Sequence, residues 1–589
     1  AEGQARLTGY AQRIAASGSL SDTERRELRD ALHKELARFD ELDILSTTAA
    51  NHYANGLWPI QLSAANPWAP FGGMDEVIEG RFTDATLSAM AFQGEIETVA
   101  LNIANWNTQG ETLRVEIAPF VLGGSDGKTS VLSQEVVDLM EVLSVATQTM
   151  DLSADALPRI NTARAITVSG WDMRQLWLNI DTTALSPGTW TTTVNLRSLA
   201  VESNTYAVPL TVTVANTKQA DINVLKHCNW GYVYNNARMR DHEAESIVER
   251  VAHGNNVFVT SITPTVKFDE KGDLIGEIDY TAHDEYMKKY ATNGMILFHN
   301  TGGVSGPGTR DSEAYKKAYI TWMRAWVKHL KDMGVGYDGY AMYPVDEPGL
   351  RDGLVDLYLD NAKLTRAADP KVLMYTDPVE RIALEEVEEM LPYVDIWCPN
   401  RIGFLLDGEN EKLTLMKEDE GAQLWNYECE GNAKHQSPLG YYRGQSWLAW
   451  HHGLTGIGFW SYCTSGADPW YRPEDTLDYL LVYQGDGVVP SKRWEAIRDG
   501  SEDYAMLHAL REATAEAQKA GRTPEAVKEA EALLADGASS IAQFCGIDAD
   551  GTTPGKGGIP GTRILADKRY AAIQAVRADV ARLMEALAK

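Results

Sequence analysis

The feature that most constrains the fold is an alternation of short apolar runs with helical stretches between residues 222 and 462. Eight runs have the length of a strand: INVLKHCNW (222–230), NVFVT (256–260), MILFHN (295–300), YDGYAMYPVDEP (337–348), VLMYTD (372–377), VDIWCPN (394–400), AQLWNYE (422–428) and GIGFWSY (456–462). Eight strand–helix units within roughly 250 residues predict an α/β fold of the (β/α)8 type, the TIM barrel. A doubly wound sheet would more usually have about five or six strands.

One of the intervening helices is especially clear. Between the third and fourth runs, apolar side chains recur on one helical face that ends at Gly334: Tyr315, Tyr319, Trp322, Trp326, Leu330 and Met333. A face of this kind is expected to pack on the barrel.

The segment ahead of the barrel has a different periodicity. Apolar and polar or small residues alternate around Val99, Leu101 and Ile103, and the same pattern returns in later runs up to about residue 216. Short alternating strands separated by turns predict an antiparallel β-sandwich.

Helical sequence is expected at both ends. SLSDTERRELRDALHKELARF (19–39) has capping candidates and leucines at helical spacing, whereas residues 46–80 are rich in Trp, Pro and Gly and are expected to be irregular. Further helices beyond residue 510 flank the loop GTTPGKGGIPGT (551–562). The sequence thus predicts four parts: a helical and irregular extension (1–80), the sandwich (81–216), the barrel (217–510) and a helical extension (511–589).

The composition narrows the range of partners. A formal net charge of −29 argues against nucleic acid or anionic lipid, since both need a basic footprint. No run of about 18 uncharged apolar residues is present that would span a membrane. The five cysteines show neither CxxC spacing nor a disulfide framework, and we expect no metal and no organic cofactor. The oligomeric state is left open.

Active sites of such barrels lie at the carboxyl ends of the strands. Aromatic rings stack on the C–H faces of a sugar and polar groups fix its hydroxyls, and the side chains expected at these ends supply both without the basic cradle that a phosphate would need. Asn300, Asp377 and Glu430 stand in this region. The residues predicted to bind the sugar are Asn229, His299, Tyr343, Trp397, Asn400, Trp425, Tyr427, Glu428, Trp460 and Tyr462.

The adjacent pair Asp346 and Glu347 follows the fourth run. Successive strand residues point to opposite faces, so both carboxylates can reach one substrate only where the strand ends. Pro348 and Gly349 mark such an end, because both residue types interrupt a strand. Alternatively, the two carboxylates could lie at the N-terminus of the following helix and stabilise it through its dipole. Their position after the fourth strand favours a catalytic role.

The segment that contains this pair, YPVDEP (343–348), resembles the Asp–Glu motif of glycoside hydrolase family 123, the β-N-acetylgalactosaminidases, and of a related, poorly characterised group. Other segments fit in the same order: FQGEIETVALNI (92–103), DIWCPN (395–400), LWNYEC (424–429), GIGFWSY (456–462) and RWEAIRDGSEDYAML (493–507). The resemblance covers about residues 85–510.

The resemblance implies a retaining, substrate-assisted exo-glycosidase for a terminal β-linked N-acetylhexosamine, above all N-acetylgalactosamine. Asp346 would orient and stabilise the 2-acetamido group, whose carbonyl oxygen attacks C1. Glu347 would protonate the leaving oxygen and then deprotonate water. Because polysaccharide hydrolases usually meet their substrates outside the cytoplasm, we expect a secreted or periplasmic protein, although the sequence begins AEGQARL, without a signal peptide.

Two alternatives stay open at this point. In the first, a sugar without an acetamido group is cleaved by double displacement, with Glu347 as acid/base and Glu428 or Glu430 as nucleophile about 5 Å away. In the second, the barrel binds glycans without cleaving them. The presence of both Asp346 and Glu347 counts against this alternative. Near the barrel mouth, Cys228, Cys398, Cys429 and Cys463 are expected to be buried thiols, ahead of a disulfide or a metal site.

Overall fold

The computed structural model describes residues 60–74, 85–124, 129–147, 152–201, 203–301, 303–305, 307–405, 410–429, 433–463, 468–471, 479–545 and 563–589, with single residues and short stretches between 8 and 50. Of the predicted N-terminal helix, residues 26–34 are helical. The loop 551–562 and Glu430 lie outside the described residues.

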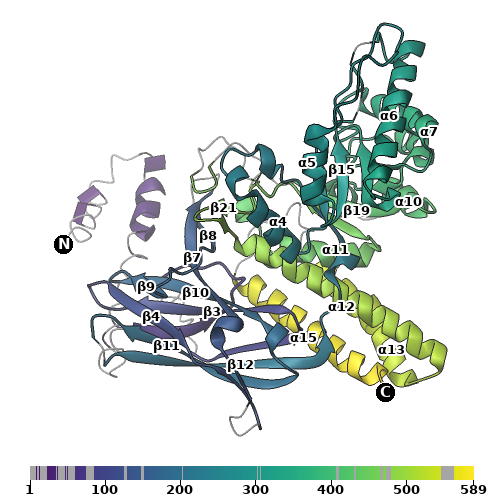
Figure 1. Ribbon diagram of the computed structural model, residues 1–589. Coiled ribbons are helices and arrows are strands. Elements are labelled where there is room, and N and C mark those ends of the chain that lie inside the picture. The colour runs from purple at the N-terminus through teal and green to yellow at the C-terminus, as the bar shows by residue number, and fades with distance from the viewer. Residues whose placement is uncertain are drawn as a thin grey trace.

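Two face-to-face sheets form the part of the chain from Ile60 to Lys218 (Figure 1). One has the order β1 (Ile60–Ala65), β3 (Ile96–Asn105), β10 (Asp172–Asp181), β7 (Val137–Ala146) and β8 (Leu152–Ala156). The other has the order β2 (Leu87–Gln93), β12 (Thr205–Lys218), β11 (Gly188–Ser198), β4 (Glu111–Ile117) and β9 (Ala165–Val168), with β5 (Phe120–Leu122) and β6 (Ser130–Val131) beside β11.

The core between the sheets is built by the alternation seen in the sequence. Leu101, Ile103, Leu113 and Val115 are fully buried in one apolar cluster. The antiparallel β-rich region is therefore confirmed, with one departure, since β2 pairs with β12 in parallel. The irregular structure predicted for residues 46–80 is wrong at β1, which pairs with β3. The run IQLSAA has a weak pattern of its own, and its strand conformation depends on that partner.

Eight parallel strands close into a barrel in sequence order, and each predicted run supplies one of them. They are β13 (Lys226–Asn229), β14 (Val257–Thr260), β15 (Met295–His299), β16 (Tyr340–Tyr343), β17 (Leu373–Thr376), β18 (Ile396–Trp397), β19 (Gln423–Glu428) and β20 (Gly456–Phe459). The helices between them are α4 (Glu243–Ala252), α5 (Thr281–Tyr290), α6 (Glu313–Asp332), α7 (Leu354–Ala368), α8 (Leu384–Met390), α9 (Arg401–Leu405), α10 (Glu411–Glu418) and α11 (Gly444–His452).

Helix α6 shows why the sequence pattern was informative. Ser312 caps it, its Oγ accepting a hydrogen bond from the Tyr315 backbone N–H at 3.2 Å. The predicted face, from Tyr315 to Leu330, is buried in the large cluster that joins the helices to the outside of the barrel. Among the described residues, no helix is long and apolar enough to cross a membrane.

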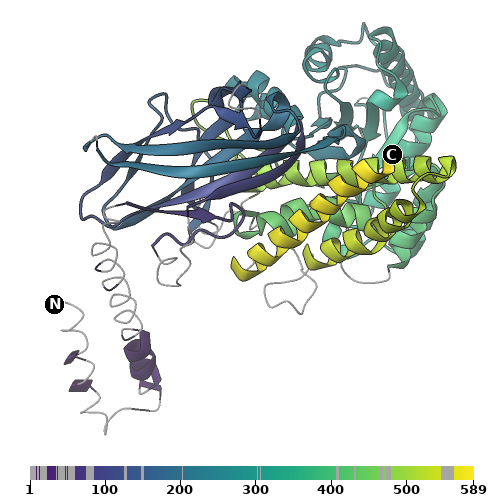
Figure 2. The same ribbon diagram turned by 90° about the horizontal axis from the view of Figure 1, so that it is seen from below.

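The C-terminal helices join the barrel to the sandwich. Helix α12 (Lys492–Ala520) runs across the boundary predicted at residue 510, and α13 (Pro524–Ala532), α14 (Ala538–Cys545) and α15 (Arg563–Leu587) follow. Helix α15, yellow in Figures 1 and 2, lies along α12 and against β12 and β2. There the buried Arg577 forms ion pairs with Glu95 and Glu97 of the sandwich and with Asp503 of α12.

The hairpin β21 (Tyr483–Gln484) and β22 (Val488–Val489) precedes α12.

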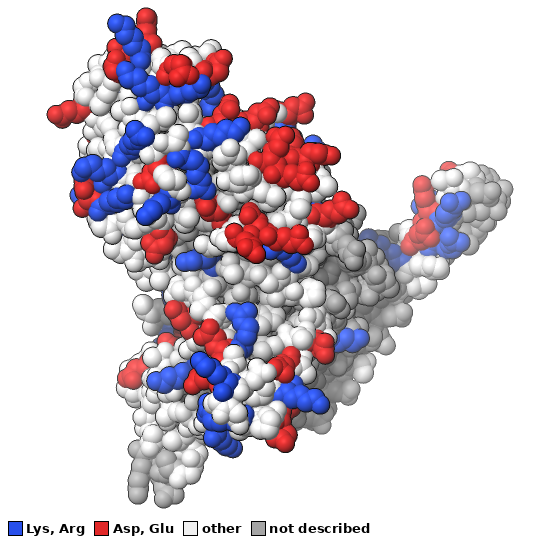
Figure 3. Space-filling model, turned by 90° about the vertical axis from the view of Figure 1, so that its right-hand side faces the viewer, with Lys and Arg blue, Asp and Glu red and all other residues white. Residues whose placement is uncertain are grey.

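On the face shown in Figure 3, acidic and basic side chains are interspersed.

Candidate active site

A pocket opens at the carboxyl ends of the barrel strands. It is lined by Trp230, Asp346, Glu347, Asp377, Tyr427, Cys429 and Trp460, which belong to or follow β13, β16, β17, β19 and β20. Its space is about 450 Å³, including the part open to solvent, within the range of about 300–1,000 Å³ usual for small-molecule sites. Asp346 and Glu347 follow the fourth strand, where the sequence analysis placed them.

The turn that carries the two carboxylates is held by contacts with the next strand–helix loop. Glu347 has φ 47°, in the left-handed region that residues with a side chain rarely adopt. Its backbone N–H donates to Asp377 Oδ1 at 3.1 Å, and the Val379 N–H donates to the Pro348 carbonyl at 3.2 Å. Gly349 lets the chains approach, since a Cβ there would lie 2.6 Å from the Ile382 nitrogen. The surrounding structure therefore maintains a strained residue at the site.

Asp346 is held in its charged form. Tyr343 Oη donates to Asp346 Oδ1 at 2.6 Å, and His299 Nε2 lies 3.7 Å from the same oxygen. Burial favours a higher pKa for Asp346, but the interactions with His299 and Tyr343 and the charge of Arg351 outweigh it and lower the pKa. A carboxylate ionised at neutral pH therefore faces the pocket.

Glu347 is shifted the other way. Burial raises the pKa of Glu347, the charges of Asp346 and Glu380 raise it further, and the hydrogen bond from Tyr427 Oη only partly opposes them. Two adjacent carboxyl groups with pKa values pushed apart can act as a negative charge and a proton donor at one substrate.

A third carboxyl group, Asp377, completes the cluster. Tyr343 Oη is within hydrogen-bond distance of both Asp346 and Asp377, yet a phenol has one hydrogen. Burial raises the pKa of Asp377 well above its usual range, and the charge of Asp346 adds to this. Tyr343 Oη therefore donates to one of the two carboxyl groups at a time, and the surroundings of Asp377 disfavour its charged form. Asp377 was expected at the end of the fifth strand but was not predicted to be a site residue.

Three predicted sugar-binding residues are corrected because their side chains point out of the barrel. Asn229 Nδ2 bonds with His227 Nε2 at 2.8 Å, and Trp397 Nε1 donates to Asp419 at 3.0 Å. Glu428 is buried, its Oε2 3.9 Å from Arg401 Nε. Alternate strand residues point to opposite sides, and the inward positions in these strands belong to their neighbours, such as Trp230 and Tyr427.

Two more predicted sugar-binding residues, Trp425 and Tyr462, do not reach the pocket. Trp425 does point inward, but it is fully buried below Tyr427 and fills the barrel core. A Cβ at Gly456 would lie 2.4 Å from the Trp425 ring, so that glycine makes room for it. Tyr462 lies outside the barrel, where its Oη donates to Glu249 of α4 at 2.7 Å.

The remaining predicted residues lie at the mouth. Tyr343, Tyr427 and Trp460 contact or line the pocket, and His299 faces Asp346. Asn400 forms a β-bridge with Tyr427, and it is not among the described residues that line the pocket.

Trp230 and Cys429 were missed as site residues. Trp230 ends the first predicted run, and its aromatic ring at a strand end was the available signal. Cys228, Cys398 and Cys463 are buried thiols, as expected, whereas Cys429 lines the pocket, and none of these four described cysteines forms a disulfide, so that alternative is wrong for them.

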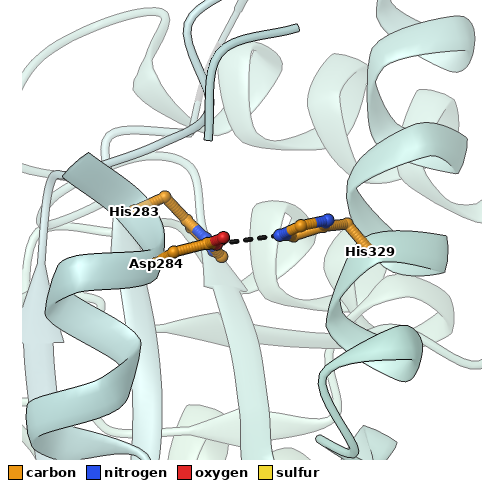
Figure 4. A group of neighbouring side chains, drawn as sticks. All are labelled: His283, Asp284 and His329. Atoms are coloured by element: carbon orange, nitrogen blue, oxygen red, sulfur yellow. Dashed lines mark hydrogen bonds and ion pairs between the residues drawn. The ribbon is translucent and has the colours of Figure 1, made fainter. Parts of the chain in front are cut away.

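One group of side chains has the composition of a metal site. His283 and Asp284 of α5 and His329 of α6 face one another on the outside of the barrel (Figure 4). Trp326 Nε1 donates to His283 Nε2 at 2.9 Å, which leaves the proton of a neutral ring on Nδ1, where it is donated to Asp284. If Nδ1 bound a metal, the ring proton would have to move to Nε2, where it would face the N–H group of Trp326. We interpret the group as a hydrogen-bonded link between two helices.

Comparisons with known proteins indicate the family to which the barrel belongs. Residues 275–510 match the family model "Glycoside hydrolase 123, catalytic domain". A solved family 123 glycoside hydrolase from Clostridium perfringens is 12% identical, with 89% of this chain and 99% of that chain covered and a TM-score of 0.67, which shows a shared fold.

A second solved structure is less similar: an endo-β-1,4-mannanase from Thermotoga petrophila has 14% identity, with 48% of this chain and 77% of that chain covered and a TM-score of 0.33. No curated protein matches the chain. The barrel, its carboxylate pair and the family match together identify residues 275–510 as the catalytic domain of a family 123 glycoside hydrolase, which confirms the resemblance seen in the sequence.

Proposed function

We propose that this glycoside hydrolase is a retaining exo-enzyme that removes a terminal β-linked N-acetylhexosamine, with N-acetylgalactosamine as the preferred sugar, by substrate-assisted catalysis on a (β/α)8 barrel. The observation that carries the proposal is the pair of adjacent carboxyl groups with opposed pKa shifts, lowered for Asp346 and raised for Glu347. Substrate assistance needs one carboxylate that stays charged and one acid that can give and retake a proton.

In the proposed reaction, the Asp346 carboxylate accepts the acetamido N–H and stabilises positive charge as the acetamido oxygen attacks C1. Glu347 gives its proton to the leaving glycosidic oxygen and later removes one from the water that opens the cyclic intermediate, so the anomeric configuration is retained. The aromatic side chains of Trp230, Tyr427 and Trp460 supply faces for the sugar ring.

Double displacement receives less support. Glu428, one of the two nucleophiles considered for it, is buried on the outer side of β19 beside Arg401. Glu430, the other, lies outside the described residues. Asp377 is in the pocket, but it accepts hydrogen bonds from Tyr343 and from the Glu347 backbone N–H, and its burial disfavours the charged form that a nucleophile needs. The catalytic-domain match weighs against a barrel that only binds glycans.

The substrate is tested with aryl β-glycosides that do or do not carry a 2-acetamido group. We expect turnover of the N-acetylgalactosaminide, little turnover of the plain hexoside, and competitive inhibition by a thiazoline that mimics the cyclic intermediate. Because the clostridial structure concerns glycolipid glycan hydrolysis, we propose a glycolipid glycan as a natural substrate to include. We also propose that the protein acts outside the cytoplasm.

The roles of the two carboxylates are tested with Glu347→Gln and Asp346→Asn. Glu347→Gln should lose about 10²–10⁴-fold on a poor leaving group and much less on an activated aryl glycoside, which barely needs protonation. Asp346→Asn should depress both. Glu380→Gln, which removes a nearby carboxylate that does not line the pocket, is the control and should keep activity. Brisk hydrolysis of plain hexosides and a covalently trapped glutamate would instead establish double displacement.

A further inference from the structure

A second cavity lies where the sandwich, the barrel and the C-terminal helices meet. We call it the seam cavity; it is lined by Trp68–Phe71 after β1, Leu152–Asp155 of β8, Lys434–Pro438 after β19, Lys492 and Arg493 of α12, and Ala566 of α15. Its space is about 700 Å³, including the part open to solvent. Among the described residues it shares none with the active-site pocket, and boundaries between domains are frequent places for small-molecule sites.

The seam cavity contains a buried amine with few partners. Lys492 is 2% exposed, and its Nζ donates to Gln175 Oε1 at 2.8 Å and lies 5.5 Å from the centre of the Trp177 ring. An ammonium group has three hydrogen-bond donors, and within the described part of the chain Gln175 is the only hydrogen-bond acceptor of Nζ. Burial lowers the pKa of Lys492 to about 7, although the charge of Asp155 acts against this.

Asp155, the carboxylate among the described residues that line the seam cavity, is already engaged. Asp155 Oδ2 accepts hydrogen bonds from Arg493 Nη2 at 2.9 Å and from Tyr483 Oη at 2.5 Å, and Oδ1 accepts one from Arg493 Nε at 3.0 Å. Arg493 and Asp155 therefore neutralise each other, and the described residues of this wall supply no further carboxylate to pair with Lys492.

Other features of the wall also favour a negative charge. The 29-residue helix α12 begins at this wall with Lys492, and the N-terminus of a helix carries a partial positive charge. Trp68 Nε1 is buried and has no hydrogen-bond partner among the described residues. In a chain with a net charge of −29, Lys492 brings a positive charge to this wall.

We propose that the seam cavity is a binding site for a small organic carboxylate. The ammonium group of Lys492 donates to the carboxylate, and Trp68 and Phe71 cover the body of the ligand, a combination suited to an acidic monosaccharide. Such a charge-assisted hydrogen bond is the strong kind in a buried environment. It would also satisfy the donors that the protein leaves without acceptors.

The test is isothermal titration of the full chain with D-glucuronate, with D-glucose as the uncharged ligand of the same size and sodium chloride at equal ionic strength. We expect glucuronate to bind and glucose not to bind. Because the ligand requires protonated Lys492, the affinity should fall from pH 6 to pH 8, approaching about tenfold per unit above pH 7. Glucose binding as tightly as glucuronate, or affinity independent of pH, would overturn the proposal.

Lys492→Met, which keeps the length of the side chain and removes the charge, should lose glucuronate binding and keep activity on aryl glycosides. Lys528→Met, at an exposed position of α13, is the matched control and should bind as the wild type does. Glucuronate binding that survives Lys492→Met places the ligand elsewhere and refutes the site. The pH series on the wild-type protein gives an answer even where the variant folds poorly. Neither result depends on which glycoside the active site cleaves.

Discussion

The hydroxyl group of Tyr343 should control the pH at which the enzyme becomes active. Its hydrogen bond to Asp346, 2.6 Å long, stabilises the carboxylate that we propose must stay charged. In Tyr343→Phe the ring remains in the barrel core and the hydrogen bond is lost. A hydrogen bond to a charged group contributes about 1.5–3 kcal/mol, and about 1.36 kcal/mol corresponds to one pKa unit, so the pKa of Asp346 would rise by about 1–2 units.

The exposure of Asp346 selects the lower end of this range. Its side chain is 61% exposed, and water can replace part of the lost bond. We therefore expect a rise of about one unit. Activity requires ionised Asp346 and falls as the pH falls through its pKa. The acidic limb of kcat/KM should consequently move to higher pH by about one unit, while the basic limb, which reports Glu347, should move less.

The assay is the pH dependence of kcat/KM for an aryl N-acetylgalactosaminide from about pH 3 to pH 9. Tyr375→Phe is the matched control, because Tyr375 packs edge-on against Tyr343 at 4.6 Å and has no hydrogen bond to Asp346. Its profile should follow the wild type. An unchanged acidic limb in Tyr343→Phe, or an equal shift in both variants, would show that this hydroxyl does not set the charge of Asp346.

Other parts of the structure lead to further expectations. Tyr427→Phe removes the hydrogen bond that lowers the pKa of Glu347, so the basic limb of kcat/KM should move to higher pH. Burial raises the pKa of Glu97 to about 8, so the folded state favours the protonated carboxyl group. The stability that this preference contributes is fully present below about pH 4.5 and is lost as the pH rises through 8. Urea unfolding should show a decline of up to about 1.4 kcal/mol per pH unit, absent in Glu97→Gln. Arg577→Met leaves buried carboxylates without their cation and should cost about 3–5 kcal/mol in the same assay. Trp397→Phe should leave KM unchanged, because this ring lies outside the pocket.

The periodicity of the sequence was sufficient for the architecture. A strand that is buried on both sides reads as a short apolar run, and a helix on the outside of a barrel reads as a stripe, so the barrel strands and α6 could be predicted from local pattern. The place of Asp346 and Glu347 followed from the same pattern, because Pro348 and Gly349 mark the end of the fourth strand.

Local pattern could not show how the barrel strands are rotated or how distant segments meet. A strand that is apolar on both sides has the same sequence pattern whichever side faces the barrel interior. The orientation of each strand nevertheless decides that Trp230 and Tyr427 line the pocket while Asn229 and Glu428 face outward. Strand β1 depends on its partner β3 in the same sheet, and α15 packs against β12 and β2, which lie hundreds of residues earlier in the chain. The opposed pKa shifts of Asp346 and Glu347 likewise depend on the packed barrel, because His299 and Tyr343 lower the pKa of Asp346, whereas burial and the charge of Asp346 raise that of Glu347. The sequence determined which strands end near the carboxylates, and only the tertiary structure decided which side chains share their pocket, because side-chain direction and burial are properties of the packed barrel.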